Sequence, residues 1–325
     1  MLIFCKNSLF SLRCLFFHLL MPMRCIMKIG YPCLNRSIGC SGSRTFRLKN
    51  YSNERMIETI GDNLDCLFKM LKYNQQYHML FFRISSDLVP FASHSVCDFD
   101  WRGYFQKNFQ KIGEFIRANA MRISMHPDQF VLINSPDEGV VERSVAELRY
   151  HAQVLDLMQL DDSAKIQIHV GGVYRDKQGS IARFIDRYER LDSSIRKRLV
   201  IENDDISYTL NDCLAIHEAT GIPILFDSFH HHLNNSGEPL GEALALIGSS
   251  WRKADGIPMC DYSSQQAGGR KGRHAESIDP EDFKRFLHAS HEVDFDVMLE
   301  IKDKEKSALQ AIRLASQDSR FIYST

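Results

Sequence analysis

Histidines and carboxylates recur at the ends of apolar, strand-like runs along the whole of this 325-residue sequence. The run RISMHPDQF carries His126, IQIHVGG carries His169, and LVIEND carries Glu202. Further runs lead in the same way to His94, Asp227, His230, Asp261 and Glu300. Neutral imidazoles and ionised carboxylates are metal ligands, and one ligand per strand end is how a barrel brings them together. The pattern therefore predicts a multi-metal site built from the whole chain.

Eight strand-like runs alternate with segments of helical period. The strands are expected at about 27–33, 79–86, 122–127, 166–171, 198–203, 223–228, 257–263 and 296–302. Their nearly continuous apolar content is typical of parallel strands that are buried on both faces. Between them, Glu54 to Tyr77 and Val140 to Met158 carry apolar stripes of helical spacing. The alternation predicts an α/β protein with a single-domain (β/α)8 TIM barrel.

The first 26 residues differ from the rest of the chain. They are apolar and contain Lys6, Arg13 and Arg24 but no acid, and their longest uncharged stretch is too short to cross a bilayer. We interpret 1–26 as an extension that is dispensable or disordered, with a targeting peptide as the alternative. The barrel domain is expected to span 27–325, without a membrane partner.

Charge and cysteine content restrict the surroundings of the protein. A formal net charge of -1 argues against a globally basic nucleic-acid coat, although it allows a local basic strip. The nine cysteines include no CxxC pair, and their odd number favours free thiols in a reducing compartment. We expect a cytoplasmic protein.

The number of candidate ligands predicts two or three divalent ions, with Glu202 able to bridge two of them. Paired ions clamp the attacking and leaving oxygens of an in-line phosphoryl displacement and generate hydroxide near neutral pH. No serine or cysteine at the strand ends has a base arranged to activate it. Phosphodiester hydrolysis by the metal cluster is therefore the expected reaction.

The same residues carry a family resemblance. Long motifs, in order, are similar to those of the UV DNA damage endonuclease family over about 28–306: GYPCLN (Gly30 to Asn35), RISSDLVPFASH (Arg83 to His94), SMHPDQF (Ser124 to Phe130), SPDEGVVERSVAELRYH (Ser135 to His151), IHVGGVY (Ile168 to Tyr174), ENDD (Glu202 to Asp205), FDSFHH (Phe226 to His231) and EIKDKE (Glu300 to Glu305). The resemblance implies an endonuclease IV-like barrel that nicks damaged double-stranded DNA 5′ of UV photoproducts and other lesions, leaving a 3′-hydroxyl. Such a protein would associate with the nucleoid when it repairs DNA.

The resemblance also implies a ligand assignment. His126 and His169 would hold the first metal, with Glu202 bridging to a second ion at Asp227, Asp261 and Glu300; His230 and His274 would hold a third. His94 would lie at the edge of the site, near the lesion phosphate. Lys302 is a candidate for stabilising the developing phosphorane charge, and its alternative role is a simple ion pair with Glu300.

Two positions depart from the family pattern. The seventh strand carries Met259 and Asp261, where the family generally has a lysine and a histidine. Asp261 would give the second metal an all-carboxylate shell, which favours Mn²⁺ over Zn²⁺. Met259 would leave the third metal with only His230 and His274, so we expect that position to be incompletely occupied.

Contacts with damaged DNA follow from the resemblance as well. Gln129 and Phe130 match residues that enter the duplex where the lesion is flipped out, although Phe130 alone could equally be a packing residue of the barrel rim. Tyr31 and Asn35 match residues that line the lesion pocket. Basic side chains in the loop 268–274 are candidates for phosphate contact: Arg270, Lys271 and Arg273.

The sequence leaves rival functions open. The same barrel could belong to an abasic-site endonuclease or to a sugar isomerase of the xylose isomerase kind. A damage-binding protein whose metal site has decayed is a non-enzymatic alternative, which the residues Met259 and Asp261 make conceivable. We infer no protein partner from the sequence.

Overall fold

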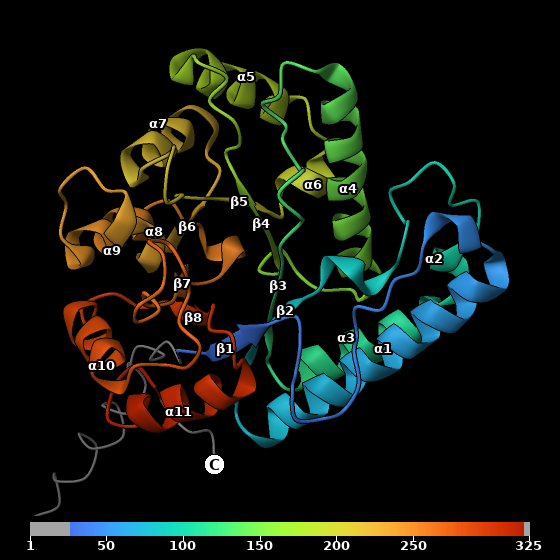
Figure 1. Cartoon of the computed structure of the whole chain (residues 1–325), viewed down its shortest axis with the longest axis horizontal. Helices are drawn as coiled ribbons and strands as arrows, with labels where there is room; N and C mark the ends of the chain where they lie inside the picture. Colours follow the sequence, from blue (N-terminus) through green and yellow to red (C-terminus); the bar gives the residue numbers. More distant parts are fainter. Residues whose placement is uncertain (1–26, 322–325) are drawn as a thin grey trace, which may run out of the picture.

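A closed barrel of eight parallel strands in sequence order forms the centre of the computed structural model, which describes residues 27–321 (Figure 1). The strands are β1 (Ile29–Pro32), β2 (Phe81–Ile84), β3 (Arg122–Met125), β4 (Lys165–His169), β5 (Leu199–Glu202), β6 (Ile224–Asp227), β7 (Met259–Tyr262) and β8 (Asp296–Leu299). Each coincides with an expected run, so the predicted single-domain (β/α)8 barrel is confirmed. The interpretation of residues 1–26 concerns a segment outside the described residues.

Helices surround the barrel on all sides (Figure 1). They are α1 (Asn53–Gln76), α2 (Trp101–Tyr104), α3 (Gln106–Ala118), α4 (Glu138–Leu157), α5 (Lys177–Glu189), α6 (Ser193–Arg196), α7 (Leu210–Thr220), α8 (Ser228–Leu233), α9 (Leu240–Gly248), α10 (Pro280–Ala289) and α11 (Glu305–Ala315), with short 3-10 turns at Leu48–Asn50, Ser86–Leu88 and Lys253–Asp255. The two long helices predicted from their apolar stripes are α1 and α4. Each begins where a side chain accepts a backbone N–H, Ser52 from Arg55 and Asp137 from Val140. None of the described helices is both long and apolar enough to cross a membrane.

Inward-facing side chains form layers inside the barrel, because alternate residues of a strand point to opposite sides. Five strands contribute to a small apolar cluster that is separate from the main core: Phe81, Val200, Leu225, Met259 and Met298. Two residues further along the same five strand segments stand Arg83, Glu202, Asp227, Asp261 and Glu300. A polar layer therefore lies towards the carboxyl ends of the strands, above a closed apolar floor.

The opposite end of the barrel is closed by buried ion pairs. Lys165 Nζ lies 2.5 Å from Asp255 Oδ1, and Arg122 Nη1 lies 3.5 Å from Asp296 Oδ2. All four side chains are at most 5% exposed, and pairing of this kind is what allows charges to be buried. This end has a structural role, while the histidines gather at the other.

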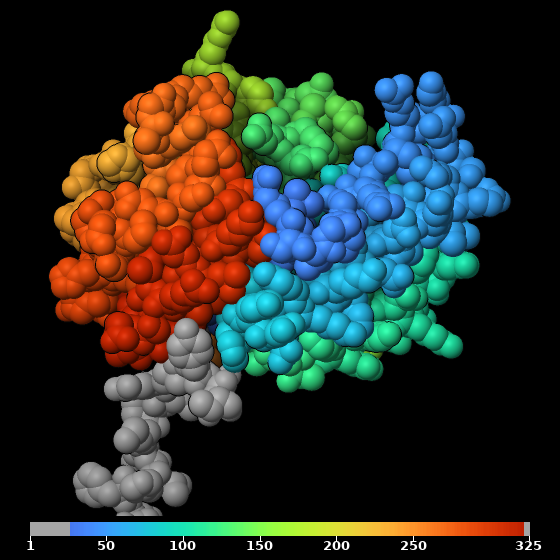
Figure 2. Space-filling view, turned by 60° about the horizontal axis from the view of Figure 1, so that its bottom comes forward, coloured from blue at the N-terminus to red at the C-terminus, as the bar shows by residue number. Residues whose placement is uncertain are grey.

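The first and last parts of the barrel are joined directly. Strand β1 pairs with β8, and the loop after β1 bonds to the start of α11, where Glu305 accepts from the backbone N–H of Arg36 at 2.9 Å and from Ser37 Oγ at 2.7 Å. Figure 2 shows this blue segment beside the red C-terminal segment. The loop after β1 is thus fixed to the start of α11.

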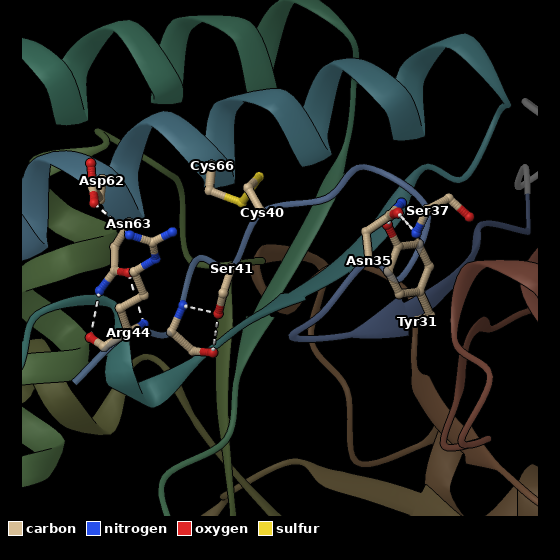
Figure 3. The surroundings of a disulfide bond; sticks show 10 residues. Tyr31, Asn35, Ser37, Cys40, Ser41, Arg44, Asp62, Asn63 and Cys66 are labelled. Atoms are coloured by element: carbon tan, nitrogen blue, oxygen red, sulfur yellow. Dashed lines mark hydrogen bonds and ion pairs between the residues drawn. A yellow bond between two sulfur atoms is a disulfide. The ribbon is translucent and has the colours of Figure 1, made fainter. Parts of the chain in front are cut away.

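A disulfide between Cys40 and Cys66 corrects the expectation that all cysteines are free thiols. Cys40 lies in the loop after β1 and Cys66 in α1, and their Cα atoms are 5.9 Å apart (Figure 3). Asn63, one turn earlier in α1, anchors the same loop by accepting from the Arg44 N–H at 2.8 Å. The loop folds back on the helix and brings the two thiols together, a pairing that chain spacing does not reveal. The other described cysteines are free: Cys33, Cys97, Cys213 and Cys260.

Candidate metal centre

The predicted ligands converge at the carboxyl ends of the strands. Strand β4 ends at His169 and β5 at Glu202, and the sheet register places these two residues side by side. Asp227 and Asp261 are paired in the same way at β6 and β7. Seven side chains fall into three overlapping groups whose ligand atoms lie within 4.8 Å of one another: His126, His169 and Glu202; Glu202, Asp227 and His230; Asp227, Asp261 and Glu300.

Glu202 is the residue that links the first two groups. One carboxylate oxygen lies 3.7 Å from His126 Nε2 and 4.0 Å from His169 Nε2, and the other lies 3.2 Å from His230 Nδ1. Burial opposes the charged form, but the three imidazoles outweigh it and lower the pKa of Glu202. Its two oxygens can therefore serve two ions at once.

The donor atoms of these two groups fit divalent cations. His126 and His169 turn Nε2 towards the Glu202 carboxylate, as ligands of a shared ion would. Asp227 Oδ2 is buried and has no hydrogen-bond partner among the described residues. A bound cation would supply the partner that this oxygen lacks. Burial also lowers the pKa of His126 to about 4, so its imidazole is neutral at physiological pH, as a metal ligand must be.

Helix α8 positions two more ligands. Asp227 begins this helix and its Oδ1 accepts the backbone N–H groups of Phe229 at 2.7 Å and His230 at 2.8 Å. Its other oxygen stays directed at His230, 3.5 Å from Nδ1. Although burial opposes it, the negative charge of Asp227 and Glu202 raises the pKa of His230, so its imidazole has to release a proton when a metal binds. A short helix directly after a strand thus adds a ligand that strand ends alone would not provide.

Two residues of the centre are not apparent from the sequence pattern. Arg83 in β2 is 3% exposed; its Nη2 lies 2.6 Å from Asp261 Oδ2, and its Nη1 donates to Glu300 Oε1. Gln167 in β4 donates from Nε2 to Glu202 Oε2 at 2.8 Å and to Asp261 Oδ2 at 2.9 Å. Arg83 lies in the apolar run FFRI and Gln167 in KIQIH. A polar residue inside such a run is the only sign in the sequence that either belongs to the centre.

A family model described as UV-endonuclease UvdE matches residues 27–322. The chain belongs to this family. The UV DNA damage endonuclease of Clostridium perfringens (strain 13 / Type A) is 35% identical over 300 residues, which cover 92% of this chain and 73% of that protein. The crystal structure of SacUVDE matches with a TM-score of 0.86 and 45% identity over 90% of this chain and 98% of that one.

More distant structures share the barrel alone. Endonuclease IV from Thermus thermophilus has a TM-score of 0.53 at 14% identity, and the match covers 76% of this chain and 92% of that one. At that identity the likeness concerns the fold.

His274 of this UvdE-family chain lies beside the centre but in none of the three groups. Its Nδ1 donates to the Glu300 carbonyl oxygen at 2.8 Å, and its ring packs against Phe229 with centroids 5.2 Å apart. The ring centroids of His274 and His230 are 6.3 Å apart. The structure thus groups His230 with Glu202 and Asp227 rather than with His274, whose role as a ligand stays a prediction.

Met259 belongs to the apolar floor and is fully buried there. A thioether in this layer packs against Leu225 and its neighbours, beneath the carboxylates. Met259, which departs from the family pattern, is therefore a packing residue of the barrel interior.

Gln129 and Phe130 stand at the rim of the centre in the loop after β3. Gln129 is exposed and borders a cavity of about 350 Å³ that is also lined by His126 and His169. Phe130 is 57% exposed, more than a packing residue of the rim would be. Both side chains are open to a ligand that approaches the cavity.

Tyr31 and Asn35 are placed differently from the expectation that they line an open pocket. Tyr31 is fully buried and donates its hydroxyl to Asn74 Oδ1 at 2.6 Å, and Asn35 is 4% exposed and donates to the Tyr31 hydroxyl at 2.8 Å. Figure 3 shows Asn35 close against Tyr31. In this conformation their polar atoms bond to one another, to Asn74 and to Ser37 inside the fold.

The remaining candidates lie at the surface. Lys302 Nζ donates to Glu276 Oε1 at 2.7 Å and to Gln266 Oε1 at 3.0 Å, so the alternative pairing with Glu300 is not formed. His94 is exposed, and its Nδ1 accepts the Val96 N–H at 3.0 Å. The three basic residues of the loop 268–274 are exposed to solvent: Arg270, Lys271 and Arg273.

Proposed function

We propose that this UvdE-family DNA repair endonuclease is metal-dependent and nicks double-stranded DNA on the 5′ side of UV photoproducts and other lesions, leaving a 3′-hydroxyl. The observation that carries the proposal is the convergence of histidines and carboxylates beneath an open rim. Glu202 joins two ligand groups there, and Phe130 projects into solvent beside them.

Two or three divalent ions, with Mn²⁺ as the proposed metal, would be held by the three groups. When bound, such ions lower the pKa of water and stabilise the charge of the reacting phosphate. Each of the three groups includes at least one carboxylate, and Glu202 and Asp227 supply carboxylate oxygens to the two groups that contain histidines. Hard oxygen donors of this kind suit Mn²⁺ better than a nitrogen-rich set would.

The residues of the chain would divide the remaining work. Gln129 and Phe130 would enter the duplex and replace the stacking that is lost when the lesion leaves the helix. Arg270, Lys271 and Arg273 would contact the phosphate backbone. Lys302 and His94 would approach the reacting phosphate, and Lys302 would exchange its bond to Glu276 for that contact.

Nicking of supercoiled plasmid tests the proposal. An irradiated plasmid should relax with the purified protein and Mn²⁺, an unirradiated plasmid should stay supercoiled, and EDTA should stop the reaction. Zn²⁺ should support it only weakly. A defined duplex with one cyclobutane dimer should be cut on the 5′ side of the dimer.

Other outcomes would point to the rival functions. Retarded migration of damaged DNA without relaxation would identify a damage-binding protein. Cutting confined to abasic duplexes would identify an abasic-site endonuclease. Complete inactivity on DNA, together with isomerisation of a sugar, would identify a sugar isomerase.

A further inference from the structure

The polar layer of the barrel contains a permanent cation of its own. Arg83 projects from β2 into a ring of carboxylates and is almost fully buried there, with 3% of its side chain exposed. One guanidinium nitrogen contacts Asp261 and a second contacts Glu300, so two separate carboxylates are bound by one side chain. A guanidinium stays charged at all accessible pH values. Its charge is therefore a fixed part of the site.

The three ligand groups differ in what already occupies them. The first two contain histidines, whose ring nitrogens lie 3.2–4.0 Å from Glu202, and neither Glu202 nor Asp227 forms an ion pair with an arginine or lysine among the residues described. The third consists of carboxylates alone, and two of its three members are already bound by Arg83. Gln167 adds a second donor to the same oxygen of Asp261, at 2.9 Å, which leaves only Oδ1 of that residue without a partner within 27–321.

The net charge of the layer also favours two bound ions over three. The layer holds four carboxylates, Glu202, Asp227, Asp261 and Glu300, against one guanidinium. With two divalent ions the positive charge exceeds that of the carboxylates by one, which suits a single phosphodiester anion. With three ions the excess would be three, and the third ion would lie against the guanidinium in a buried environment that strengthens their repulsion.

We propose that Arg83 takes the place of a metal ion, so that the centre holds two divalent ions, one at His126, His169 and Glu202 and one at Glu202, Asp227 and His230. This inference rests on the proposed metal dependence. Asp261 and Glu300 then serve to hold Arg83, and Arg83 is a positioning residue that fixes the charge and shape of the layer.

Metal counting tests this on the full chain. The protein is saturated with Mn²⁺, freed of unbound ions by gel filtration, and analysed by inductively coupled plasma mass spectrometry. The wild type should retain two ions per chain. Asp261→Asn keeps the size of the side chain and an oxygen for Arg83, and it should also retain two. Glu202→Gln, the matched control within the same layer, should retain fewer than two.

Arg83→Met supplies the converse test, because it frees Asp261 and Glu300 for an ion and should raise the count to three. If that variant does not fold, the numbers of ions retained by the wild type and by Asp261→Asn still decide whether the centre holds two ions or three. Three ions in the wild type, or a lower count in Asp261→Asn, would overturn the role of Arg83 even if the irradiated plasmid is nicked. Two ions without lesion-dependent nicking would overturn the proposed function instead, and a protein that binds no ion would overturn both.

Discussion

Replacement of Phe130 by alanine is the most direct test of how the protein would recognise damaged DNA. Stacking of an aromatic side chain on a base is worth about 1–3 kcal/mol, so its loss should reduce the preference for lesion over undamaged duplex by about 5-fold to 150-fold. The fold should tolerate the change. Phe130 is 57% exposed, which leaves roughly 90 Å² of buried surface and a destabilisation of about 2 kcal/mol at most.

The preference is measured as the ratio of dissociation constants for a dimer-containing and an undamaged duplex, by fluorescence anisotropy with EDTA present to prevent cutting. Phe130→Tyr keeps the stacking face and should keep the ratio. Tyr77→Ala removes another exposed aromatic side chain, at the end of α1 that precedes β2, and should also leave the ratio unchanged. An unaltered ratio in Phe130→Ala would show that Phe130 has no part in recognition.

Three further changes test the centre, the core and the chain terminus. Glu202→Gln should abolish incision of the irradiated plasmid while circular dichroism shows an unchanged fold, because it removes a shared ligand charge and no packing group; full activity with unchanged metal content would refute the assignment. Burial lowers the pKa of His151 to about 4. Between that value and about 6.5, His151 therefore binds more protons in the unfolded chain than in the folded chain, and stability falls as the pH drops through this range. From pH 7 to 5, His151 should lower the free energy of unfolding by about 2 kcal/mol. Urea unfolding at both values should show a smaller loss for His151→Leu than for the wild type, and equal losses would contradict this pKa. A chain that begins at Met27 should fold and nick DNA as the full chain does, and precipitation or inactivity would show that residues 1–26 are needed.

Much of the fold and of the ligand set could be predicted because both follow from local patterns. An apolar run that ends in a histidine or a carboxylate marks a buried strand and its polar end at the same time. In a closed barrel all such ends meet, so His126 and Glu202 could be placed together without knowledge of any contact. Elements of this kind depend on neighbours along the chain or on adjacent strands.

Contacts across the barrel could not be predicted in this way. Arg83 binds residues 178 and 217 positions further along the chain, and within FFRI it has the form of an isolated charge. Tyr31 and Asn35 were expected to face a ligand, yet Tyr31 donates its hydroxyl to Asn74, 43 positions further along the chain, and accepts from Asn35 inside the fold. The partner of a buried polar group depends on distant parts of the chain, which periodicity does not encode.

The two departures in the seventh strand have a common explanation in the layers of the barrel. Met259 and Asp261 are two residues apart, so both face the interior, but they lie at different depths. At the depth of Met259 the neighbours are Val200, Leu225 and Met298, and an apolar side chain there completes the floor without adding a charge. One layer higher, Asp261 contributes a negative charge that Arg83 neutralises. With Met259 the lower layer has no charged side chain, so Arg83 is the one arginine or lysine among these two sets of inward-facing residues. With Asp261 the upper layer gains a carboxylate that Arg83 binds directly. Both departures therefore fit the proposal that this guanidinium replaces a metal ion.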